Sequence, residues 1–194
     1  ILSGLVGSEM CIRDSSRDDH ALLHSCNSYG IAMTVATSIW LFQVVFAIGL
    51  ANWFSIAAIN NVCAFRASAW AVGNTMAMTP LSQDPRIDIP LLTRAISSPA
   101  LHRLALMLVI LLQIIAAVTC WLGSYQLVVA GDLTAARAWL NLALCSFAAF
   151  IFAMHLGGLW FAYWIRQGEL QLTHISLLLW VLAAFFLFNF QWTS

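Results

Sequence analysis

The 194-residue chain is 62% hydrophobic, has 8% charged residues and carries a formal net charge of zero. A soluble domain has about 25% charged residues, so this composition excludes a water-soluble globular protein. No basic cluster of the kind that binds nucleic acid is present. The Cys residues form no C-x-x-C pair and have no metal-ligand spacing. Cys120 and Cys145 lie inside apolar runs and are predicted to be ordinary core residues.

The beginning of the chain has the pattern of non-native sequence. Residues 4–15 resemble the conceptual translation of a sequencing adapter, and such a segment carries no information about the fold. We therefore expect residues 1–15 to be non-native and leave residues 16–32 as an unassigned tail. Met33, just ahead of the first strong apolar run, is the expected native start. A single membrane domain is predicted over residues 33–194.

All eight basic residues are Arg, and the charges fall in short zones that leave four long charge-free stretches. Each stretch exceeds the roughly 20 apolar residues that a helix needs to cross a bilayer. None contains Pro or the period-2 alternation of a barrel strand. The predicted fold class is an all-α integral membrane protein, a four-transmembrane-helix bundle. The predicted spans are about 36–59, 100–129, 136–165 and 173–191.

The first span is predicted to end at Asn60-Asn61. Within it, Ala47, Ala51 and Ser55 form a ladder of small residues at helical spacing, which favours close approach of another helix.

Residues 60–98 form the long non-spanning region and contain three of the four Pro. Its piece Ile87 to Ile96 mixes Ile and Leu with two charges, which is typical of an interfacial amphipathic segment. At its end, Ser98 is predicted to be the N-cap and Pro99 the first residue of the second span.

The second and third spans are predicted to be antiparallel neighbours, because only a very short turn separates them. Gly131 is expected to end the second helix, and Asp132 to cap the third.

The third span contains a second small-residue ladder, Ala149, Ala153 and Gly157. We expect this ladder to face the inside of a left-handed antiparallel bundle. The aromatic cluster at residues 160–164, followed by Arg166, is typical of a membrane–water interface.

Three pieces of the chain resemble a known family. They are Asn60-Asn61, residues 94–102 (Arg-Ala-Ile-Ser-Ser-Pro-Ala-Leu-His) and residues 157–164 (Gly-Gly-Leu-Trp-Phe-Ala-Tyr-Trp). The chain resembles the bacterial predicted small integral membrane proteins, domain of unknown function 2165, over about 33–192. The residues that carry the resemblance are Asn61, Arg94, Ser98, Pro99, His102, Gly158, Trp160, Phe161 and Trp164.

The chain also departs from the family pattern. Leu159 and Gln113 stand where family members usually have Glu, and the polar segment between the first two spans is largely different. The resemblance therefore implies a divergent member with the family's membrane fold, and it implies no particular activity.

Three histidines are candidates for holding a cofactor. His155 lies alone in the third span, and His102 and His174 begin the second and fourth spans on the same side. Intramembrane ionisable groups are costly and often functional, so these residues define an alternative in which the protein holds haem b or a metal. If the third helix ends near Ile165, His155 lies roughly 15 Å from that end, deeper than the other two. Hydrogen-bonded packing is the favoured interpretation.

Four other polar residues lie in or near the spans: Gln43, Asn52, Gln113 and Asn141. Interhelical hydrogen bonding is their expected role, and a polar transport path is the alternative.

The sequence shows no nucleophile motif and no paired carboxylates. We therefore expect no catalytic residues, no cofactor and a non-enzymatic accessory, assembly or envelope component. A haem- or metal-binding electron carrier is the first alternative and a small transporter the second. The expected partners are the lipid bilayer and other membrane proteins or a second copy, but no nucleic acid.

The expected location is the bacterial inner membrane. The Arg count near span ends favours a cytoplasmic 60–98 segment. The family resemblance implies cytoplasmic termini instead, and this second orientation is the one that we predict.

Overall fold

A computed structural model describes residues 34–190. The predictions for residues 1–15, residues 16–32 and Met33 lie outside these residues. Four helices of the described part are long and apolar enough to cross a membrane, and the described residues contain no strand. The all-α membrane bundle is therefore confirmed. Its elements are α1 (Val35–Cys63), α2 (Phe65–Met76), α3 (Thr79–Ser82), η1 (Pro90–Arg94), α4 (Pro99–Tyr125), η2 (Gln126–Ala130), α5 (Leu133–Trp160), η3 (Tyr163–Ile165) and α6 (Gly168–Asn189).

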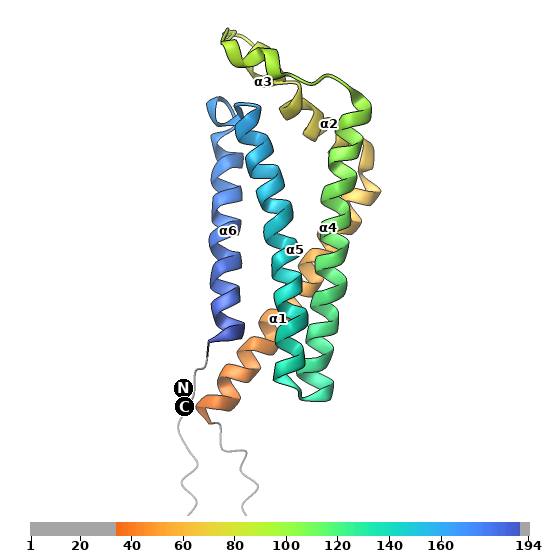
Figure 1. Cartoon of the computed structure of the whole chain (residues 1–194), viewed down its shortest axis with the longest axis vertical. Helices are drawn as coiled ribbons and strands as arrows, with labels where there is room; N and C mark the ends of the chain where they lie inside the picture. Colours follow the sequence, from red (N-terminus) through yellow and green to blue (C-terminus); the bar gives the residue numbers. More distant parts are fainter. Residues whose placement is uncertain (1–33, 191–194) are drawn as a thin grey trace, which may run out of the picture. The chain divides into compact units, whose positions relative to one another are not determined.

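The α4–α5 hairpin forms as its local signals predict. Pro99 is the first residue of α4, with Ser98 in the N-cap position, although the Ser98 side chain makes no capping bond. The π-helical turn η2 extends α4 to Gly131, whose φ of 66° turns the chain. The Asp132 side chain then accepts a hydrogen bond from Ala135 N at 2.9 Å and caps α5. The two helices lie side by side and antiparallel (Figure 1).

Helix α1 is longer than predicted. It passes through Asn60-Asn61 and ends at Cys63, and α2 follows after Ala64. The Asn61 side chain donates to Gln113 Oε1 at 2.9 Å across to α4. The Asn61 side-chain amide, which the sequence suggests as the end of the helix, is thus bonded to a neighbouring helix and α1 continues past it. The prediction that the helix stops at Asn60-Asn61 is wrong.

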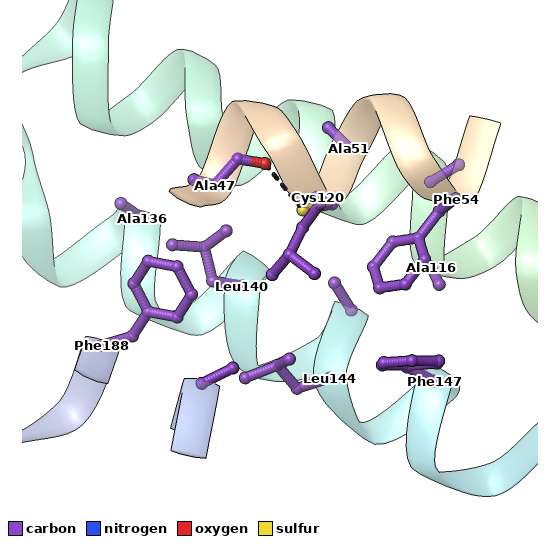
Figure 2. Close-up of a cluster of buried hydrophobic side chains, with 14 of the residues drawn as sticks. Ala47, Ala51, Phe54, Ala116, Cys120, Ala136, Leu140, Leu144, Phe147 and Phe188 are labelled. Atoms are coloured by element: carbon purple, nitrogen blue, oxygen red, sulfur yellow. Dashed lines mark hydrogen bonds between the residues drawn. The ribbon is translucent and has the colours of Figure 1, made fainter. Parts of the chain in front are cut away.

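The small residues of α1 let α4 approach closely. Ala47 and Ala51 are both fully buried, and the thiol of the buried Cys120 lies 3.5 Å from the Ala47 carbonyl oxygen (Figure 2). The ladder predicted in the first span is therefore confirmed as a helix-packing surface.

Aromatic rings join α1 to α5 and α6. The rings of Phe54 and Phe147 lie 4.8 Å apart, and those of Trp53 and Trp180 lie 4.7 Å apart, measured between centroids. Aromatic side chains supply large buried areas, so this cluster fills the space that α1 leaves as it crosses the other helices obliquely (Figure 1).

Polar side chains form further links between the helices. Gln43 donates to the Leu187 carbonyl of α6 at 2.9 Å, and Asn141 and Asn189 exchange two hydrogen bonds at 2.8 and 2.7 Å. With Gln113, three of the four polar residues have the predicted interhelical role. The prediction for Asn52 is wrong, because this side chain bonds to Ile48 O on its own helix.

The second small-residue ladder faces outward. Ala149 and Ala153 are exposed and Gly157 is half-buried, so the prediction that they face the interior is wrong. The interior side of α5 carries bulky residues such as Phe147 and Ile151, which are needed to fill the space beside α1. Cys145 lies on the outward side too, so its predicted core role is also wrong.

The region between α1 and α4, which we call the cap (residues 64–98), packs on the bundle at two places. Helix α2 packs on α4, with Ala69 buried against Leu106 and Ile110. In the piece Ile87 to Ile96, residues 90–94 form the 3₁₀ turn η1, and the residues on either side of it belong to no helix or strand. Its apolar side chains pack against Met78 of the cap and Ala162 of the α5–α6 turn.

We expect Ala47→Leu to lower the free energy of unfolding by about 1–3 kcal/mol, because the added atoms enter a filled helix contact. Ala153→Leu is the matched control: its side chain points outward, and we expect little change. Thermal unfolding of both variants in detergent measures the difference. Equal melting temperatures for the two variants would contradict the assignment of the buried faces.

Candidate functional site

Three polar rings meet at the α5–α6 turn. The Tyr163 hydroxyl oxygen lies 2.8 Å from His155 Nδ1 and 3.3 Å from His174 Nδ1. Tyr163 and His174 are only 3% and 5% exposed, and His155 is half-buried. We call these three residues the His–Tyr–His cluster.

The cluster forms because α5 ends early. The helix stops at Trp160, five residues after His155, and α6 starts at Gly168, six residues before His174. With a rise of 1.5 Å per residue, the two histidines lie about 7.5 and about 9 Å from their helix ends. They are therefore at matched depth, and the prediction that His155 lies much deeper is wrong. That prediction placed the end of α5 near Ile165.

The backbone conformation at Ala162 and the contact with Gly158 determine the position of Tyr163. Ala162 is fully buried and has a φ of 54°, a left-handed conformation that costs a non-glycine residue about 1–3 kcal/mol. The Tyr163 ring then lies directly on Gly158, where a Cβ atom would be only 2.7 Å from ring carbons. Packing on both sides therefore fixes the position of the phenol.

The hydroxyl links the tautomers of the two imidazoles. A phenol has one hydrogen to donate, so it can donate to only one of the two Nδ1 atoms at a time. The other ring then has to donate its own N–H to the phenol oxygen. Burial raises the pKa of the Tyr163 phenol, which keeps the bridging hydroxyl protonated.

The third candidate histidine has a different role. His102 Nε2 lies 2.8 Å from the Ile96 carbonyl oxygen, and its ring packs so closely on Gly73 that a Cβ atom there would clash. The structure thus unites His155 and His174, whereas His102 fastens the cap to α4. Among residues 34–190, no three His, Cys, Asp or Glu side chains gather as a metal-ligand set.

A haem does not fit between the paired histidines. Their rings lie 6.2 Å apart between centroids, but the Tyr163 hydroxyl is within hydrogen-bond distance of both Nδ1 atoms. A bis-histidine haem needs space for a flat macrocycle between its two axial ligands. Tyr163 occupies that space.

Comparison with known proteins identifies the family of the chain. The family model for predicted small integral membrane proteins, domain of unknown function 2165, matches residues 39–191. The chain belongs to this family. No curated protein and no solved structure matches the chain. The family assignment confirms the sequence resemblance and agrees with the four apolar helices.

The residues that carry the family resemblance contact other parts of the cap and the turn. The Arg94 guanidinium lies over the Trp160 ring at 4.4 Å, and Phe161 packs in the cluster around Met78. Trp164 is half exposed. Most of the residues that carry the family resemblance thus join the cap to the bundle or pack against Tyr163.

Sequence reasoning missed Tyr163. The aromatic pattern of residues 160–164 indicates side chains at the membrane–water interface, and this interpretation gives the tyrosine hydroxyl no partner. The signal is the position of Tyr163 between His155 and His174, and it becomes readable only once the end of α5 is known. The Gly157-Gly158 pair precedes that end and gives no indication of which glycine the ring needs.

We expect Gly158→Ala to lower the melting temperature and separate the rings of the cluster, because the added methyl group meets the Tyr163 ring. Gly157→Ala is the matched control. No atom lies within 4 Å of the position of its Cβ, and Ala favours a helix over Gly by about 0.5–1 kcal/mol. Thermal unfolding in detergent compares the two. Equal effects would show that the ring does not rest on Gly158.

Proposed function

We propose that this protein is a non-enzymatic accessory or assembly component of the bacterial inner membrane that binds another membrane protein through its cap. The observation that carries the proposal is that residues 64–98 form a folded surface anchored at two places, on α4 and on the α5–α6 turn.

Several bonds hold the cap in one position. The Arg166 guanidinium donates to the Pro85 carbonyl, and Thr75 donates to Gln167 Oε1 at 3.3 Å. Within the cap, Ile96 N donates to Met76 O at 2.8 Å. A surface that is already ordered loses little conformational freedom when a partner binds, so this anchoring supports a role in recognition.

The outer side of the cap is suited to a protein partner. Residues 82–86 and Asp88 are exposed and include both acidic and basic side chains, whereas Ile87 and Ile89 point into the apolar cluster. Mixed charges at an interface give specificity more than raw affinity. This pattern supports recognition of a complementary protein surface over binding to a polyanion.

The polar residues within the spans support a structural role. Gln43, Asn61, Gln113 and Asn141 are all engaged in hydrogen bonds between helices. A side chain that holds two helices together is committed to the fold, which argues for a structural role over a polar transport path.

Photocross-linking in cells tests the cap. A photoreactive amino acid in place of Arg86 or Asp88 should give a protein adduct of discrete mass. The same amino acid at Leu179, an exposed position of α6, serves as the control and should react with lipid. A protein adduct from Leu179 but none from the cap positions would refute the proposed surface.

We further propose that both termini lie in the cytoplasm and the cap in the periplasm. The family resemblance supports this orientation, whereas the Arg count near the span ends favours the opposite one. A fluorescent reporter that matures only in the cytoplasm, fused after Ser194, should fluoresce. Alkaline phosphatase activity from the same position would establish the opposite orientation.

A further inference from the structure

We propose that the His–Tyr–His cluster binds a divalent ion of a late first-row transition metal through His155 Nδ1, the Tyr163 oxygen and His174 Nδ1. The inference is independent of the proposed role of the cap. It rests on the convergence of three donor atoms from three elements, α5, η3 and α6.

The spacing of the donors fits one ion. Donor atoms bound to the same metal at about 2.0 Å lie about 2.8 Å apart at a right angle and about 3.3 Å apart at a tetrahedral angle. The two distances from the Tyr163 oxygen to the imidazole nitrogens are 2.8 and 3.3 Å. Both imidazole nitrogens thus lie at distances from the phenol oxygen that two ligands of one ion also have.

The donor set favours particular metals. Imidazole nitrogen suits Zn²⁺, Cu²⁺, Ni²⁺ and iron, and Cu²⁺ binds most strongly in this series. Binding replaces the protons on the donor atoms. The phenol O–H bond breaks, a metal–oxygen bond forms and that proton leaves to solvent, and the imidazole that donated its Nδ1–H carries its proton on Nε2 instead, which frees Nδ1 to bind the ion. Both imidazoles coordinate as neutral rings. In the metal-free protein, the cost of burying a phenolate opposes ionisation of Tyr163. The positive charge of a bound ion offsets this cost.

The site is organised before an ion arrives. Tyr163 is held between Gly158 and the left-handed turn at Ala162, and its ring stacks on His174 at 5.8 Å between centroids. His155 is half-buried, so part of its side chain is not covered by the protein. A bare ion needs far less space than the macrocycle that Tyr163 excludes.

Cu²⁺ titration of the full-length protein in detergent tests the proposal. The background carries substitutions at other residues able to bind copper: Cys11, His20, His24, Cys26, Cys63 and Cys145. We expect one Cu²⁺ per chain and a visible tyrosinate-to-copper charge-transfer band. His155→Gln and His174→Gln should each weaken binding tenfold or more, as judged from the roughly 10–100-fold cost of disturbing even an outer-shell partner.

Two further variants separate a metal site from a packed cluster. Tyr163→Phe keeps the ring and should abolish the charge-transfer band while the two imidazoles retain weaker binding. His102→Gln removes the histidine outside the cluster and should leave both affinity and band unchanged. Thermal unfolding of each variant establishes that it is folded. Absence of stoichiometric binding, binding unaffected by His155→Gln, or a band that persists in Tyr163→Phe would each overturn the proposal.

Discussion

Polar groups inside the spans have to be paired within the protein, because lipid offers them no hydrogen bonds. The described helices meet this constraint by using such groups as links. The Asn141–Asn189 pair ties α5 to α6, Gln43 ties α1 to the same helix, and Asn61 with Gln113 ties α1 to α4. Each of these bonds joins two helices at a defined position along their length.

The same constraint explains the His–Tyr–His cluster. An imidazole near the end of a span needs a partner, and the partner of His155 among the described residues is Tyr163, which follows the end of α5. The chain provides it by ending α5 at Trp160 and folding Tyr163 back between the two helices. One phenol thus serves two histidines. The outcome is a buried polar site whose atoms have the spacing of metal ligands.

The sequence predicts features that depend on local or averaged signals. Charge-free stretches of sufficient length locate four spans, and the Gly131-Asp132 turn is readable because each residue acts on its own helix end. The sequence predicts poorly the features that depend on contact with another helix. Asn60-Asn61 has the composition of a helix end, yet Asn61 is bonded to α4. The ladder at Ala149 and Ala153 has helical spacing, but spacing cannot say which side of α5 faces α1. The cluster was missed because it depends on where α5 stops.

Ala162 connects the cap to the His–Tyr–His cluster. This residue precedes Tyr163 and is buried in the apolar cluster with Met78 of the cap. Both Ala162 and Met78 have a positive φ, 54° and 52°, and such strain persists only where the surrounding packing imposes it. Each strained turn is thus buried in the same apolar cluster as the other. The packing of the cap therefore contributes to holding the backbone that carries the Tyr163 hydroxyl to the two histidines.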